Sequence, residues 1–194
     1  MFKNTKMVIA ASVIALSLGA CAGNTGSDHA MSDEKTVMVG GAPMYPSKNI
    51  VENAVNSKDH TTLVAAVQAA GLVDTLASPG PFTVFAPTNA AFAKLPDGTV
   101  DTLLKPENKA TLTKVLTYHV VPGTLTAADL MEKTKAMGGK YEMTTASGGT
   151  ITAEMKNGGL YVVDDKGQWS KITIANVMQS NGVIHVVDTV LLPG

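Results

Sequence analysis

The 194-residue sequence contains no arginine, and all 15 of its basic residues are lysines. Recognition of phosphates and base edges relies on the fixed fork of donors that a guanidinium group provides, and no run of lysines replaces it here. The 16 acidic residues outnumber the 15 lysines. The net charge becomes about −3 once Lys3 and Lys6 are removed with an N-terminal signal. We therefore expect no nucleic-acid partner.

Cysteine is almost absent as well, because Cys21 is the only one. An intrachain disulfide is thereby excluded. A lone thiol would be unusual in a secreted chain unless it had a role of its own. The sequence around Cys21 suggests such a role.

The longest apolar run lies at the N-terminus, where lysines precede residues 7–18 and small residues follow them. This three-part layout predicts a signal peptide over residues 1–20. The end of the run, Leu18-Gly19-Ala20-Cys21, resembles a bacterial lipoprotein signal, in which the cysteine is lipidated and begins the mature chain. We expect an exported outer-membrane lipoprotein that faces the periplasm or the cell surface, held to the membrane only by its lipid. Ordinary cleavage after Ala22, giving a soluble periplasmic or secreted protein, is the alternative.

Catalytic and metal-binding motifs are missing too: the sequence has no GxSxG, phosphate loop, HExxH or CxxC, and its four histidines are scattered. Asp164 and Asp165 are adjacent, but before Lys166-Gly167 they predict a solvated turn. We therefore expect no enzyme, no cofactor and no metal.

Residues 21–45 are rich in glycine, serine and aspartate and predict a flexible tether, with packing of residues 37–45 on the domain as the alternative. A single domain is expected over residues 46–194. Its first helix would begin after the N-cap Ser47, and a second would span residues 59–70 and end at Gly71.

Two apolar segments predict buried strands. Residues 82–86 are bulky on both alternating faces, and Pro87 ends the strand before a short helix capped by Thr88 or Asn89. Residues 183–192 contain three polar side chains and are too short for a membrane span, so they predict a central strand.

Helices predominate before residue 141, and an alternating pattern with hairpin turns at residues 157–159 and 165–167 follows it. This layout predicts an α+β fold. Inside its strands, His119 and His185 favour hydrogen-bonded core histidines over metal-binding or catalytic ones, because no second ligand is near in sequence.

Three segments resemble the marks of the fasciclin domain family: residues 80–92, the pair Tyr118-His119, and residues 181–193. The resemblance implies a wedge-like β-sandwich with helices packed around it, and an extracellular adhesion or interaction module without catalysis. Its motif positions, structural or interacting, would be Thr83, Phe85, Pro87, Thr88, Asn89, Phe92, Tyr118, His119, Gly182, His185, Val187 and Asp188.

The expected partners are extracellular or envelope proteins or polysaccharides. An integrin is not expected, because the sequence lacks Arg-Gly-Asp. The alternative function is a carrier of a small apolar ligand in the periplasm, with its pocket between helices and sheet. An envelope hydrolase is a remote third class.

Overall fold

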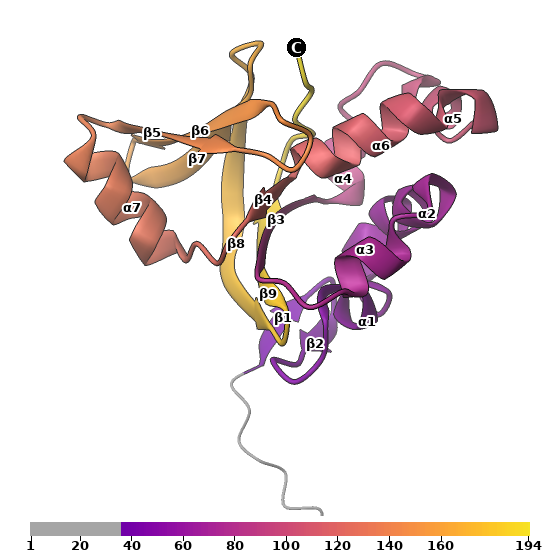
Figure 1. Ribbon diagram of the computed structural model, residues 1–194, viewed down its shortest axis with the longest axis horizontal. Helices are drawn as coiled ribbons and strands as arrows, with labels where there is room; N and C mark the ends of the chain where they lie inside the picture. Colours follow the sequence, from indigo (N-terminus) through magenta and orange to yellow (C-terminus); the bar gives the residue numbers. More distant parts are fainter. Residues whose placement is uncertain (1–35) are drawn as a thin grey trace, which may run out of the picture. The chain divides into compact units, whose positions relative to one another are not determined.

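The computed structural model describes residues 36–194 (Figure 1). No helix in this range is long and apolar enough to cross a membrane. The predicted signal peptide and Cys21 lie outside the described residues.

The described chain begins with a β-hairpin of β1 (Val37–Val39) and β2 (Ala42–Met44). Val39 and Met44 are buried in the core, so the predicted domain start at residue 46 is wrong and the alternative, packing of residues 37–45, is what the structure has. The first helix, α1 (Ile50–Ala54), is capped by Asn49 and not by Ser47. Asn49 forms a capping box with Glu52, which satisfies two backbone N–H groups that the helix leaves free.

Two short helices follow α1. After the 3₁₀ turn η1 (Lys58–His60), α2 (Thr61–Ala70) ends at Gly71, whose φ of 72° gives the predicted left-handed cap. The next helix is α3 (Val73–Ala77). Helix α1 packs on α3, whereas α2 packs on α6.

The buried strand β3 (Phe82–Pro87) leads into α4 (Asn89–Phe92), which is capped by Thr88 as predicted. The connection to the next strand contains α5 (Thr99–Leu103), η2 (Pro106–Asn108) and α6 (Lys109–Tyr118). After β4 (Val120–Pro122), α7 (Ala127–Ala136) begins at a capping box between Thr126 and Asp129.

The remaining elements are strands: β5 (Lys140–Thr144), β6 (Thr150–Lys156), β7 (Gly159–Val163), β8 (Trp169–Gln179) and β9 (Gly182–Val187). The sheet order is β4-β3-β9-β8-β7-β6-β5, antiparallel throughout except for the parallel pair β3–β9. The first apolar segment is therefore a central strand, as predicted. The second is a central strand only as far as Val187, because residues 188–192 leave the sheet. The α+β fold class is confirmed.

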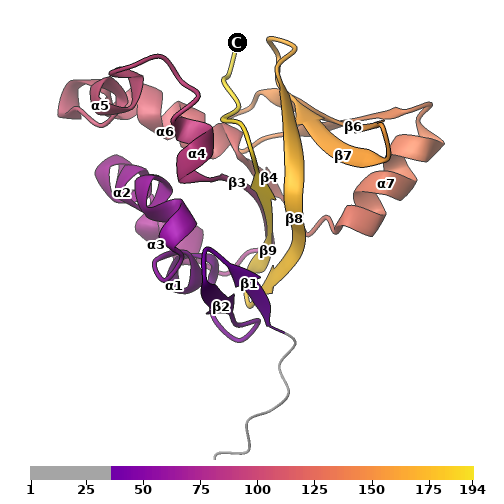
Figure 2. The ribbon, with the colours of Figure 1, turned by 180° about the vertical axis from the view of Figure 1, so that it is seen from behind.

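Strand β8 bends this sheet into two layers. Its first three residues pair with β7, and the rest, interrupted by register shifts, pair with β9. Figure 2 shows β5–β7 and α7 on one side of β8, and the other helices beyond β3 and β9 on the opposite side. Past β5, the Ala146 N–H donates to the Val120 carbonyl of β4 at 2.7 Å, which brings the two ends of the sheet together.

Two apolar cores result. One lies between the two layers of strands and includes Phe85, Tyr118 and Leu130. The other lies between helices α1–α6 and the outer face of β3 and β9, and includes Val84, Leu116 and Ile184. The second core contains the cavity described next.

Candidate binding site

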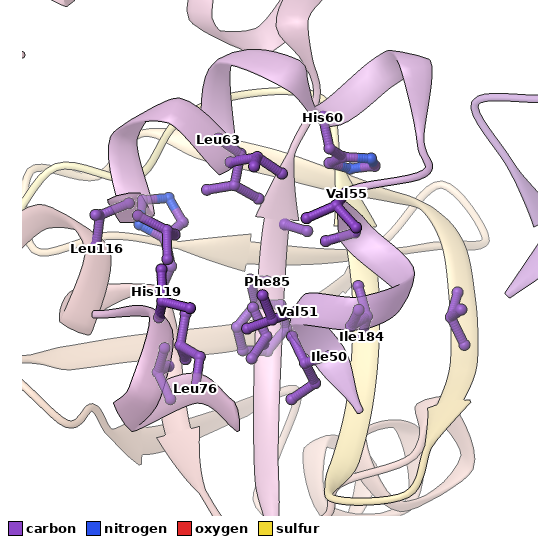
Figure 3. Close-up of a pocket in the computed structure, with 18 of the residues that line it drawn as sticks. Ile50, Val51, Val55, His60, Leu63, Leu76, Phe85, Leu116, His119 and Ile184 are labelled. Carbon is purple, nitrogen blue, oxygen red and sulfur yellow. The ribbon is translucent and has the colours of Figure 1, made fainter. Parts of the chain in front are cut away.

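A cavity of about 250 Å³ lies between the helices and the outer face of β3 and β9. We call it the helix–sheet cavity (Figure 3). Strands β3 and β9 supply Val84, Ala86 and Ile184, and the helices supply mostly valine and leucine side chains. The lining contains no lysine, aspartate or glutamate. An engineered apolar cavity of about 150 Å³ takes up benzene, so this one has room for an organic molecule.

The cavity reaches the surface between the two helix pairs, α1 with α3 and α2 with α6. Val55 lines it and is 52% exposed, and Gln68 in α2 is an exposed lining residue. Val51 and Val64 also line it, with half-buried side chains. The exposed side chains of Val55 and Gln68 therefore mark where the cavity opens to the surface.

Three polar residues line the cavity: His60, Gln68 and His119. His60 is 3% exposed, and its Nδ1 lies 2.9 Å from the Ser57 hydroxyl. Its Nε2 has no hydrogen-bond partner. Burial lowers the pKa of His60, and the nearby Ala86 backbone and the Asp59 carboxylate offset part of this lowering. His60 is therefore a neutral imidazole whose Nε2 is enclosed by protein atoms.

His119 lies in another part of the lining (Figure 3) and has no free nitrogen. Its Nδ1–H donates to the Val115 carbonyl at 2.8 Å, and its Nε2 accepts from the Leu191 N–H at 2.9 Å. Burial lowers the pKa of His119 to about 4. The imidazole thus joins the end of α6 to the segment after β9.

Tyr118 points to the other side of the same junction, into the core between the strand layers. Its hydroxyl donates to the Thr150 carbonyl at 2.6 Å and accepts from the Asp165 N–H at 3.0 Å. Burial raises the pKa of Tyr118 to about 12. Together, Tyr118 and His119 connect α6 to β6, to the β7–β8 turn and to the C-terminal segment.

His185 is fully buried in β9, and its ring stacks on Phe85 with centroids 5.7 Å apart. Its Nε2–H donates to the Leu125 carbonyl at 2.8 Å, and its Nδ1 accepts from the Asn176 N–H at 3.4 Å. Burial lowers the pKa of His185. Both nitrogens of this histidine are also occupied by the scaffold.

Two motif threonines and an asparagine bond to backbone groups near β3. Thr83 donates to the Gly123 carbonyl and accepts from the Leu125 N–H. Thr88 caps α4, and the Asn89 side chain bonds to the backbone where α2 begins. Each of these side chains fixes a connection between elements.

The other motif residues serve packing and chain direction. Phe92 and Val187 are buried, and Pro87 is the last residue of β3. A Cβ at Gly182 would collide with the Phe82 carbonyl, so this position requires glycine for close approach of β9 to β3.

Asp188 follows β9 and is half-buried. Its carboxylate accepts from the Lys171 N–H at 2.9 Å and lies 3.5 Å from the Lys94 ammonium. Burial opposes ionisation, but these contacts and a bond from Thr189 hold the pKa of Asp188 below its usual value. Asp188 thus anchors the end of β9 to β8.

The prediction of a solvated turn at Asp164 and Asp165 is half wrong. Asp165 is exposed, but Asp164 is buried, and its carboxylate accepts from the N–H groups of Lys166, Gln168 and Leu192. The Asp164 carboxylate therefore accepts hydrogen bonds from backbone N–H groups of the β7–β8 turn and of the C-terminal segment. Among residues 36–194 no group of three or more metal-ligating side chains is close enough to hold a metal ion.

Sequence reasoning missed two residues. His60 gave no signal, because it has no ligand-spaced neighbour and precedes an ordinary helix. The sequence predicts for Asn181 only a place in a motif segment. In the structure its Oδ1 accepts from the Ile50 N–H, and its Nδ2 donates to the carbonyls of Leu76 and Ser78. An asparagine before a glycine is typical of a simple turn, so the sequence does not indicate that Asn181 links helices to the sheet.

Comparison with known proteins identifies relatives of this architecture. The fasciclin domain model matches residues 58–193. Protein sll1483 of Synechocystis sp. is 48% identical over 162 residues, which make up 82% of this chain and 82% of that protein. The immunogenic protein MPB70 of Mycobacterium bovis is 37% identical over 145 residues, 72% of this chain and 66% of the other.

A solved structure shares the fold. It is a FAS1 domain pair from the insect cell adhesion molecule fasciclin I, with a TM-score of 0.69 and 18% identity. The match covers 76% of this chain and 52% of the insect chain.

Proposed function

Since this chain belongs to the fasciclin domain family, we propose that it is a non-catalytic interaction module of the cell envelope or cell surface, with protein or polysaccharide partners. The observation that carries the proposal is the engagement of the motif side chains with the scaffold. The histidines, Tyr118 and Asp188 all bond to groups that hold elements together. The histidine, tyrosine and aspartate side chains of these motifs therefore stabilise the domain. Contacts with a partner would be made by the surface of the domain.

Photo-crosslinking tests this function at defined surface positions. Met38, Met137 and Met178 are exposed and lie in β1, after α7 and in β8, so photo-methionine incorporated in growing cells would sample three surface positions. We expect at least one reproducible cross-linked partner that disappears in one of the variants Met38→Leu, Met137→Leu and Met178→Leu. The matched control is Met143→Leu, because Met143 is buried and should change no intermolecular cross-link. Absence of any partner that depends on an exposed methionine would contradict the proposal.

Lipid tethering through Cys21 belongs to the same proposal. Cys21→Ser should move the protein from the membrane fraction to the soluble fraction and block processing by the lipoprotein peptidase. Several acyl chains anchor stably where one alone is marginal, so the shift should be nearly complete. Recovery of wild-type protein as soluble material beginning at Gly23 would refute lipidation and favour ordinary cleavage.

The helix–sheet cavity favours a second candidate function, a carrier of a small apolar ligand. Its lining is almost wholly apolar, it is open between the helix pairs, and its volume is about 250 Å³. Native mass spectrometry of protein purified from its own host would separate the candidates. A carrier arrives with a bound small molecule, whereas an interaction module arrives with an empty cavity.

A further inference from the structure

The outer face of β6, β7 and β8 is the side turned away from the core between the strand layers. Val162 of β7 belongs to that core, so Tyr161 points outward. Ile172 of β8 belongs to the same core, so Lys171 and Trp169 point outward as well. Helix α7, which contacts β5 and β6, packs on the core side and leaves this outer face to solvent.

Two aromatic side chains lie together on this face. Trp169 and Tyr161 meet edge to face with ring centroids 5.7 Å apart, and both are half-buried. A Cβ at Gly159 would lie 3.1 Å from Cε2 of Tyr161, so the missing side chain makes room for the tyrosine ring over the strand. The pair therefore presents flat ring surface on the sheet.

Two exposed lysines accompany the rings. The Lys156 ammonium lies 4.3 Å from the centroid of the Trp169 ring, and Lys171 is the cross-strand partner of Tyr161. Neither ammonium forms an ion pair with a described residue. We call Lys156, Tyr161, Trp169 and Lys171 the Trp169 platform.

The carboxylates that adjoin the Trp169 platform in the strand pairing are neutralised by other lysines. Glu154 of β6 lies 2.8 Å from the Lys140 ammonium. Asp188, which accepts from the backbone N–H of Lys171, lies 3.5 Å from the Lys94 ammonium. The platform therefore carries two uncompensated positive charges, although the chain as a whole is slightly acidic.

These features specify a partner that combines apolar faces with negative charges. The C–H face of a sugar ring suits an aromatic ring face, where the π electrons are negative. Carboxylates on the same polymer would meet the two ammonium groups. The cation–π contact of Lys156 is weak at an exposed site, so a sugar ring can displace this ammonium from Trp169 and keep it as a counter-charge.

Two other anionic partners fit less well. A nucleic acid carries a charge at every nucleotide, and two lysines neutralise few of them. A lipid surface favours apolar side chains that reach into it, whereas both rings here are half-buried in a flat sheet.

We propose that the Trp169 platform binds an acidic polysaccharide, with sugar rings stacked on Trp169 and Tyr161 and carboxylates at Lys156 and Lys171. This inference rests on the proposed interaction module and names one binding surface and the class of its partner.

The test compares a short oligogalacturonate with its methyl ester, which has the same sugars without the charges. Trp169 is the only tryptophan of the chain, so a change in tryptophan fluorescence during titration reports binding at the platform itself. Titration calorimetry on the full-length protein gives the affinities. We expect the acid to change the emission and to bind about fivefold to tenfold more tightly than the ester, the worth of two exposed ion pairs.

Variants separate the charges from the rings. Lys156→Gln combined with Lys171→Gln should abolish the preference for the acid and its weakening by salt. Trp169→Leu should weaken both probes about tenfold, because the stacking surface is lost. The matched control is Lys48→Gln, which removes an exposed ammonium 5.0 Å from the Tyr45 ring centroid and should change neither affinity. Since both platform lysines are exposed, the double variant decides the question even if Trp169→Leu does not fold.

Each contrary outcome has a distinct meaning. Equal affinity for acid and ester in the wild type would overturn the acidic class, and binding without a change in emission would overturn the platform as the site. Tighter binding of oligothymidylate or of phosphatidylglycerol vesicles would overturn the polysaccharide class. If oligogalacturonate does not bind, the polysaccharide inference fails, whereas the interaction module fails only if the cross-links at exposed methionines are absent too.

Discussion

At the scale of single residues, polar side chains inside this fold bond to backbone groups that helices and strands leave unpaired. His119 is the clearest case. One ring nitrogen donates to the Val115 carbonyl near the end of α6, and the other accepts from the N–H of Leu191. Both bonds require the neutral ring in one tautomer. The protonation state of this side chain is thereby linked to folding.

Unfolding stability should fall as the pH drops from about 6.5 toward 4. Burial holds the pKa of His119 at about 4 in the fold, whereas in the unfolded chain it is near 6.5. Above pH 6.5 both states are neutral and stability is full; below it the unfolded state binds the proton first, so stability is lost as pH falls through this window. His119 should contribute a loss of about 3 kcal/mol, measured by urea titrations across the pH range.

The variant His119→Asn keeps one hydrogen bond and removes the titrating group. Its stability should depend less on pH between 4 and 6.5 than that of the wild type. The pKa values of His60 and His185 are lowered in the same direction, so some dependence should remain. An unchanged pH dependence in His119→Asn would show that the linkage lies elsewhere.

Phe85→Ala should reduce the free energy of unfolding by about 3–5 kcal/mol. The ring is fully buried in β3 between the strand layers and stacks on His185, so its removal leaves a large cavity. Val55→Ala is the control, because Val55 is 52% exposed and its truncation should cost less than about 1 kcal/mol. Equal melting temperatures for Phe85→Ala and wild type would contradict the burial of this strand.

At the scale of elements, one asparagine joins three segments far apart in sequence. Asn181 precedes β9 and bonds to the start of α1 and to the carbonyls that end α3. These are backbone groups at helix ends, where no intrahelical partner is available. Asn181 thus attaches the α1–α3 pair to the start of β9, beside the bond that Asn53 of α1 donates to the Gln179 side chain of β8.

Asn181→Ala should destabilise the domain by roughly 2–4 kcal/mol, because it leaves buried backbone groups unpaired. The loss should be accompanied by faster hydrogen exchange in α1 and α3 than in α6. Asn108→Ala, which removes one exposed bond to the Thr102 carbonyl, is the matched control and should change little. Uniform exchange across all helices would contradict the local attachment.

Strand identity and helix caps could be predicted where the signal is local. The two-faced apolar run ending at Pro87, the cap at Thr88 and the stop at Gly71 each depend on neighbouring residues alone. The N-cap at Asn49 could not be told from Ser47 two residues earlier, because both residue types cap helices. The pair Asp164-Asp165 before Lys166-Gly167 is typical of a solvated turn, so the burial of Asp164 could not be predicted. The helix–sheet cavity could not be predicted in detail, because its walls come from segments more than 100 residues apart.

At the scale of the whole domain, the N-terminal hairpin β1–β2 belongs to the core and is not part of a linker. Val39 and Met44 are 3% exposed each, and both line the helix–sheet cavity. The Lys58 N–H also donates to the Gly40 carbonyl, which fixes the hairpin turn to η1. The hairpin therefore closes one side of the cavity.

A chain that begins at residue 46 should be less stable than one that begins at residue 36 by roughly 3–5 kcal/mol, the worth of burying two such side chains. It should also lose affinity for apolar probes such as naphthalene. Thermal melts of the two chains measure the first effect. The control is a chain that begins at residue 36 and carries Met38→Ala. Its melting temperature should equal that of the unmodified chain that begins at residue 36, because Met38 is exposed. Equal melting temperatures for the chains that begin at residues 36 and 46 would show that the hairpin does not stabilise the domain.

The position of β9 has a consequence for when the domain can fold. This strand follows all the other strands of the domain in chain order, yet it lies between β3 and β8 and contributes to both apolar cores. Until it is available, β3 has only β4 beside it, and the residues that close both cores are missing. Neither core can therefore be closed until β9 has joined the sheet. Completion of the domain becomes a late event that follows the arrival of its final strand.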